Sequence, residues 1–137
     1  MAAVLAGGPD AVLSHESAAA LWGIAPESSG PIEIAVPANS GRRCPGVRIY
    51  RRMSLTPADV TERDRIPVIS PVLTLVELAG IGYVRLEQAV NEADRLDLVD
   101  PEELRVSLEV HRGRRGVRRL RELLDRRTFR LTDSELE

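Results

Sequence analysis

The segment 65–80, RIPVISPVLTLVELAG, constrains the fold more than any other part of this chain. Its first residues are β-branched and flank a proline, which predicts a short strand at 65–69. Ser70 then stands where a helix N-cap belongs, and Pro71 fits the first helical position. The apolar residues that follow recur at i, i+3 and i+4, and Gly80 is a natural helix stop. The segment therefore predicts a core in which a strand turns directly into a buried helix, and it carries almost no reactive group.

Two further segments alternate between apolar and polar residues with a period of two, at 32–36 and 47–51. This alternation predicts half-buried strands, which we expect to form an antiparallel hairpin with a long basic tip. Arg42 and Arg43 lie in the tip and Arg48 lies in the second strand, so all three are candidate contacts to a nucleic-acid backbone. A solvated loop explains the same residues equally well.

Helices are predicted over 15–22, 85–96, 101–110 and 117–127 from their apolar periodicity and their caps. Trp22 is expected to fill the core beside the sheet, because it is large, apolar and unique in the chain. The predicted fold class is α+β: a small, mainly antiparallel sheet covered by helices, with a helical C-terminal half. Residues 1–6 resemble the end of a helix whose beginning is missing.

The distribution of charge is more informative than its sum, a formal net charge of −2. All 19 cations are arginines, and 15 of them lie in 40–52 and 101–130. Arginine binds phosphate in a bidentate manner, but arginine usage of this kind also arises from a GC-rich genome. On the final helix, ion pairs Arg118–Glu122 and Arg121–Asp125 are expected to neutralise part of the charge. The candidate nucleic-acid-binding arginines of the second region are Arg112, Arg114, Arg115, Arg118 and Arg119.

The residues do not support an enzyme, a metal centre or a cofactor site. His15 and His111 have no ligand spacing with each other or with Cys44, the single cysteine. Ser14 and His15 are neighbours in sequence, which does not make a nucleophile and its base. No phosphate-cradling glycine motif, signal peptide or membrane span is recognisable. We therefore expect a soluble cytoplasmic protein with no catalytic residue, no metal, no cofactor, no small-molecule ligand and no membrane partner.

Several motifs together resemble the central region of AbiEi-type antitoxin and transcriptional-regulator proteins. These are LSHESAAALWG at 13–23, IPVISP at 66–71, TLVELA at 74–79, RLEQAVNEA at 85–93 and GRRGV at 113–117. The resemblance is closer to actinobacterial chains in which this region precedes a very-short-patch-repair-like endonuclease domain of unknown function. The family usually has an arginine where this chain has Leu73, so a polar role at that helix start is not carried over.

The resemblance also implies how the chain is organised. In the family a winged helix-turn-helix precedes the point where Met1 stands, and the nuclease domain opens with a Ser-x-Leu-Glu motif, here Ser134 to Glu137. We expect 1–130 to be an AbiEi-like central module and 131–137 to be the start of a truncated nuclease-like domain. The expected function is a non-catalytic module that positions a DNA reader and a nuclease, and that contacts DNA weakly and without sequence preference. The alternative is a protein-interaction module that binds a toxin or forms a homodimer through apolar residues at 1–5 and 129–131.

Overall fold

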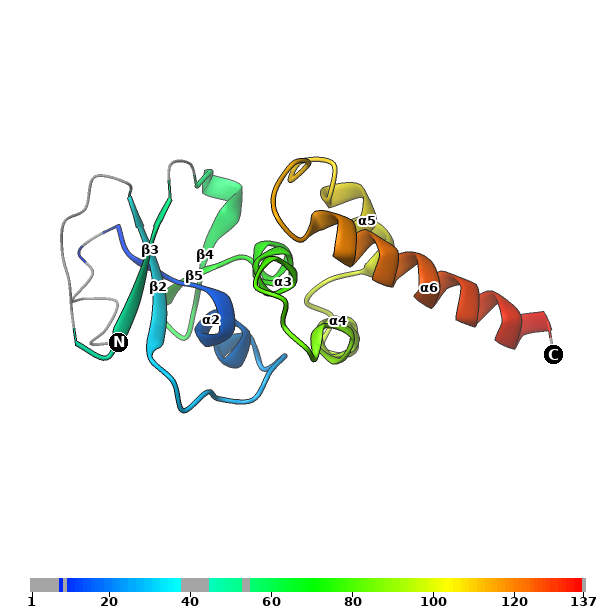
Figure 1. Cartoon of the computed structure of the whole chain (residues 1–137), viewed down its shortest axis with the longest axis horizontal. Coiled ribbons are helices and arrows are strands. Elements are labelled where there is room, and N and C mark those ends of the chain that lie inside the picture. The colour runs from blue at the N-terminus through cyan, green and yellow to red at the C-terminus, as the bar shows by residue number, and fades with distance from the viewer. Residues whose placement is uncertain (1–7, 9, 38–44, 53–54, 137) are drawn as a thin grey trace. The chain divides into compact units, whose positions relative to one another are not determined.

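The computed structural model describes the backbone of residues 8, 10–37, 45–52 and 55–136, and side chains as far as Arg126. The chain divides into two compact units, residues 1–74 and 75–137, and the division falls within one helix. Among its described residues, the first unit contains a five-stranded sheet, the α-helix α2 and a short 3₁₀ helix (Figure 1). Its elements are β1 (Val12–Leu13), α2 (His15–Trp22), β2 (Ile32–Pro37), β3 (Val47–Arg52), the 3₁₀ helix η1 (Pro57–Asp59), β4 (Val60–Arg63) and β5 (Ile66–Ile69).

The sheet has the strand order β3-β2-β1-β5-β4 and is mixed. β1 pairs with β2 and β4 pairs with β5 in antiparallel fashion, whereas the β1–β5 and β2–β3 pairs are parallel. The α+β class is thus confirmed, but the predicted antiparallel hairpin of 32–36 and 47–51 is wrong. Alternation of apolar residues fixes which face of a strand is buried and says nothing about its direction. The connecting segment is also too long to force the tight return of a two-residue hairpin.

The two faces of β2 and β3 differ in chemistry, as the alternation predicts. Ile34 and Val36 form a buried apolar cluster with Ala11, and Val47 and Ile49 pack against it. Because side chains alternate across a strand, the intervening residues of β2 and β3 point to the opposite face. That opposite face receives the start of α2 and carries the polar groups described below.

Helix α2 begins and ends as the sequence predicts, although its cap differs in detail. Ser14 has the extended backbone of an N-cap, but its side chain makes no capping bond. Gly23 closes the helix in the left-handed conformation at φ 81°, which glycine adopts without steric cost. Trp22 is 7% exposed and its indole N–H donates to the carbonyl of Ile69 at 3.0 Å. The predicted burial of this side chain beside the sheet is confirmed.

The second unit is helical and begins within α3, the helix that follows β5. Ser70 caps α3 as predicted, because its Oγ accepts from the amide of Leu73 at 3.2 Å. Asp100 caps α5 through the amide of Glu102 at 2.8 Å, with Pro101 at the first helical position. The helices are α3 (Pro71–Gly80), α4 (Leu86–Arg95), α5 (Pro101–Ser107) and α6 (Val117–Leu136).

Most of the predicted inward positions of these helices are buried. The buried set comprises Leu75 and Leu78 of α3, Leu86, Ala89, Val90 and Ala93 of α4, Leu104 of α5, Leu108, and Val117, Leu120, Leu123 and Leu124 of α6. Val110, the last residue of the predicted helix 101–110, is 83% exposed because the helix ends at Ser107. Helix α6 is longer than predicted, and strands β1 and β4 were not predicted.

Candidate nucleic-acid interface

In the first unit, polar side chains meet where the start of α2 lies over β2 and β3. The parallel register places Glu33 beside Arg48, and Ala35 beside Tyr50. The ring of His15 stacks on that of Tyr50 with their centroids 3.8 Å apart. The Tyr50 hydroxyl in turn donates to Oε2 of Glu33 at 2.8 Å. One aromatic pair and one carboxylate thus connect the helix to both strands.

Glu33 is the buried centre of this polar cluster, with 5% of its surface exposed. Its Oε1 accepts from the amide of Glu16 at 3.0 Å, and its own amide donates to Oγ of Ser17 at 2.9 Å. A carboxylate at a helix N-terminus is stabilised by the free amides and by the helix dipole. The SHES segment at 14–17 therefore fastens α2 to β2, and its residues have structural roles.

His15 is 3% exposed, and the geometry determines which ring nitrogen carries its proton. Nη2 of Arg52 lies 3.3 Å from Nε2 of His15, and a guanidinium only donates, so Nε2 is the acceptor. The proton therefore lies on Nδ1, which donates to Oγ of Ser14 at 2.9 Å. Burial lowers the pKa of His15 to about 4, and the cations Arg52 and Arg48 act in the same direction. In this tautomer His15 cannot accept a proton from Ser14, so the pair is not a nucleophile with its base.

Arg48 is the one candidate of the 40–52 region that the structure describes. It is exposed, and its hydrogen bond with the Tyr50 hydroxyl raises the pKa of its guanidinium. Arg42 and Arg43 lie outside the described residues. Arg51 and Arg52 also belong to β3, and the sequence reasoning did not select them as contacts.

In the second unit, two glycines let the end of α3 approach the segment that leads into α6. A Cβ built on Gly116 would lie 2.3 Å from the amide nitrogen of Gly80 and 2.6 Å from the carbonyl carbon of Ala79. A Cβ on Gly80 would lie 3.0 Å from the carbonyl oxygen of Arg115. Gly116 also has φ 93°, a conformation that disfavours other residues. The sequence indicated turns at both glycines, and nothing in it indicated that they would meet.

This close approach leaves a pocket of about 720 Å³ beside the first turns of α6. Three arginines and one acid line it, together with the small and apolar residues that end α3 and follow it. Its lining residues are Ala79, Gly80, Ile81, Gly82, Arg115, Gly116, Arg118, Arg119 and Glu122. Three of the five arginines predicted in this region therefore share one concavity.

Arg119 is the most firmly held of these arginines. Its Nη2 donates to the carbonyl oxygen of Tyr83 at 2.8 Å, which fixes the guanidinium against the segment between α3 and α4. Its Nη1 is shielded from solvent, and no described residue accepts a hydrogen bond from it. A buried donor without an acceptor costs about 1–3 kcal/mol, so an acceptor supplied by a ligand would be favourable here.

The other predicted arginines are held less firmly. Arg118 is 94% exposed at its side chain and lies 3.4 Å from the carboxylate of Glu122, as the i, i+4 spacing predicts. Such an exposed pair contributes little, typically about 0–1 kcal/mol. Arg112 and Arg115 are exposed, and Arg114 is half-buried.

The chain matches the model of a known family. Residues 10–126 match the family model of the AbiEi antitoxin C-terminal domain. The chain belongs to this family. No curated protein and no solved structure matches the chain.

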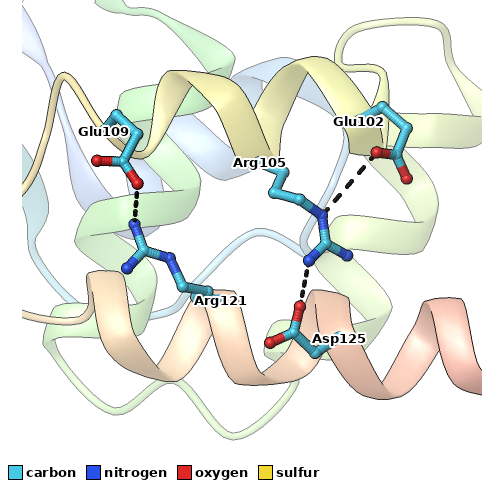
Figure 2. A network of polar contacts seen from close by, with 5 residues as sticks. All are labelled: Glu102, Arg105, Glu109, Arg121 and Asp125. Carbon is cyan, nitrogen blue, oxygen red and sulfur yellow. Dashed lines mark hydrogen bonds and ion pairs between the residues drawn. The ribbon is translucent and has the colours of Figure 1, made fainter.

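Within this AbiEi-family chain, the predicted pair Arg121–Asp125 is wrong, because both residues bond to other partners. Arg121 donates to Oε1 of Glu109 at 3.0 Å, and Asp125 pairs with Arg105 of α5. Arg105 also lies 3.9 Å from Glu102 within α5. The Arg105–Asp125 and Arg121–Glu109 pairs join α5 and the residues just after it to α6 (Figure 2). Arg105 and Arg121 are therefore matched by acids, in contrast to Arg119 of the pocket, which bonds to a carbonyl oxygen.

Three further observations concern the chemistry available to the AbiEi-family chain. Leu73 near the start of α3 is fully buried, so this position offers no cation. Among the described residues, no group of three or more His, Cys, Asp or Glu side chains is arranged to hold a metal ion. None of the helices searched in the described part of the chain is long and apolar enough to span a membrane.

Proposed function

We propose that this chain is the non-catalytic module of an antitoxin-like or nuclease-associated DNA-binding protein. The module positions a DNA reader and a nuclease, and its arginines contact the DNA backbone. Membership of the AbiEi antitoxin family supports the antitoxin or regulator role in its general form. Backbone contact is a more specific claim and depends on the arginines.

The observation that carries this proposal is the concentration of cations between residues 112 and 119. Five arginines lie in eight residues, three of them line one pocket, and Glu122 is the one acid in that lining. Two nearby acids, Asp125 and Glu109, are engaged with Arg105 and Arg121 instead. The segment 112–119 contains no acid, so it carries a local excess of positive charge that attracts phosphate.

Duplex binding measured by fluorescence anisotropy at several salt concentrations tests the proposal. Without a reader helix, binding should be weak and independent of sequence, with a Kd of roughly 10⁻⁴ to 10⁻⁶ M. Each phosphate that an arginine neutralises should add about 0.9 to the slope of log K against log salt. The variant Arg112→Ala/Arg115→Ala should therefore lower that slope by about two units.

The matched control is Arg95→Ala/Arg126→Ala, which removes the same charge from exposed positions of the same unit outside the pocket. It should leave the slope nearly unchanged. A third variant, Arg42→Ala/Arg43→Ala, measures the contribution of the β2–β3 connection. Absence of binding at low salt, or an equal loss in the control variant, would refute backbone contact by these arginines.

A second candidate function is a protein-interaction module that binds a toxin or forms a homodimer. The specific observation in its favour is the exposure of Val106 and Val110, at 73% and 83%, near the end of α5. Exposed apolar side chains in one region are typical of protein-binding surfaces. The apolar residues at 1–5 and 129–131, which we expected to serve this role, lie outside the described side chains. Light scattering of the parent and of Val106→Glu/Val110→Glu tests dimerisation, which the double variant should abolish.

A further inference from the structure

The pocket beside α6 has features that a flat basic surface lacks. It is a shallow, open hollow of about 720 Å³, and one of its cations is fixed in place by the bond from Arg119 to Tyr83. A fixed guanidinium loses little side-chain entropy when it binds a ligand, because it is already ordered. Arg115 lies on the same wall and makes no ion pair within the described part of the chain, so it is available to a ligand.

The charge of the lining favours a dianion over a monoanion. Arg115, Arg118 and Arg119 supply three positive charges and Glu122 supplies one negative charge, which leaves an excess of two. A phosphate monoester carries a charge of about −1.5 to −2 at neutral pH and offers three acceptor oxygens. A carboxylate or a backbone diester carries one negative charge and matches this excess less well.

The position of the pocket relative to α6 adds a second source of attraction. Leu120 donates to the carbonyl of Gly116, so the amides of Arg118 and Arg119 precede the first i→i−4 bond of the helix. Amides in this first turn, and the helix dipole, favour negative charge. Ile81, 46% exposed, provides an apolar wall that suits the carbon skeleton attached to a phosphate.

We propose that this pocket binds a phosphate monoester group, with Arg119 as the fixed anchor and Arg115 and Arg118 as the cations that close over it. Two sources share this chemistry: the terminal phosphate of a nucleic-acid strand and a free phosphate or small phosphate ester. The assignment of a nucleic-acid strand as the source rests on the proposed function. The existence of a phosphate site does not depend on it. The site shares its arginines with the backbone contacts proposed above, but those contacts require no hollow.

Titration of the ¹⁵N-labelled full chain with inorganic phosphate tests the site directly. We expect the amide signals of Ile81, Gly82 and residues 116–119 to shift together with one Kd. Arg119→Gln should weaken that Kd about tenfold, as expected for the loss of one charge-assisted contact. Arg126→Gln removes the same charge from an exposed position of α6 outside the pocket and should have little effect.

Two further variants keep the test decisive if Arg119→Gln unfolds through loss of its bond to Tyr83. Arg115→Gln alters an exposed lining residue and should weaken phosphate binding. Glu122→Gln removes the opposing carboxylate and should strengthen binding severalfold. A Kd that is unchanged in Arg115→Gln and Glu122→Gln would overturn the proposal, as would the absence of shifts at 81–82 and 116–119.

Oligonucleotides distinguish the two sources and separate this inference from the proposed function. If a 5′-phosphorylated strand binds more tightly than the same strand with a 5′-hydroxyl, and Arg119→Gln abolishes the difference, the source is a strand end. If inorganic phosphate binds but the two strands bind equally, the source is a free phosphate compound. If 5′-hydroxyl duplex binds while phosphate does not, the pocket proposal fails and backbone contact stands. Acetate that binds as tightly as phosphate would overturn the choice of a dianion.

Discussion

The close approach of Gly116 to the end of α3 leads to a sharp prediction about stability. Alanine at this position would place a methyl group 2.3 Å from the amide nitrogen of Gly80, where only backbone atoms are available to move. It would also hold a non-glycine residue at φ 93°. We therefore expect Gly116→Ala to destabilise the second unit through both a steric and a conformational effect.

Gly113→Ala separates these two effects, because Gly113 has a similar φ of 87° and a methyl group added there would meet no atom within 4 Å. A left-handed conformation costs an alanine about 1–2 kcal/mol, from which the lower entropy of the unfolded chain subtracts about 0.4–1 kcal/mol. Gly113→Ala should therefore cost about 1 kcal/mol. Overpacking adds about 1–3 kcal/mol, so Gly116→Ala should cost about 2–4 kcal/mol in total.

Urea denaturation of the two variants and the parent, followed by circular dichroism at 222 nm, measures these differences in unfolding free energy. Most of the helix signal comes from the second unit, where both glycines lie. The decisive quantity is the difference between the two variants, since the conformational cost is common to both. If Gly116→Ala and Gly113→Ala agree to within about 0.5 kcal/mol, the smallest difference that such extrapolations resolve, the close approach is refuted.

Three further predictions concern pH, ion pairs and catalysis. The pKa of His15 is lowered from 6.5 to about 4 in the folded chain. Between pH 6.5 and pH 4 the unfolded chain therefore binds more protons than the folded chain. The free energy of unfolding should then fall by about 3 kcal/mol as pH drops from 6.5 to 4. Urea midpoints at pH 5 and pH 7 should show a smaller difference in His15→Gln than in the parent, and an equal difference would contradict the buried neutral ring. Arg121→Ala breaks an exposed pair with Glu109 and should change the unfolding free energy by less than about 1 kcal/mol, measured in the same way. The purified chain should not cleave duplex DNA with Mg²⁺ or Mn²⁺, since a nuclease needs several acids around its metal; metal-dependent cleavage that Glu137→Ala abolishes would show otherwise.

The sequence predicted those elements whose ends are set by neighbouring residues in the chain. Ser70 and Pro71 set the start of α3, and Asp100 and Pro101 set the start of α5, because a cap and a proline act on the adjacent turn alone. The buried face of α4 followed from its 3.6-residue period. The two-residue strand β1 carries no such signal, since it is held by pairing with β2 and β5 on either side.

Pairings between distant segments were not predictable in the same way. β3 runs parallel to β2, a direction that the alternation of 47–51 does not encode. The polar cluster of the first unit was missed for a related reason. Glu33 alternates like any half-buried strand residue, and only the folded chain brings the first turn of α2 to its carboxylate. The pocket likewise requires Gly80 and Gly116 to meet across 36 residues.

The arginines of α6 show how one helical period assigns different roles to chemically identical residues. Successive residues turn by about 100°, so the buried stripe of Val117, Leu120 and Leu124 has a flank on each side. Arg121 lies on the flank that faces Glu109 and is neutralised there, whereas Arg119 lies on the other flank and bonds to a carbonyl, which leaves its charge unmatched. The period thus predicts from sequence which arginines border the core, while the partner on each flank decides whether the charge is cancelled. For this reason we place the phosphate site at Arg119 and its neighbours rather than across the whole basic segment.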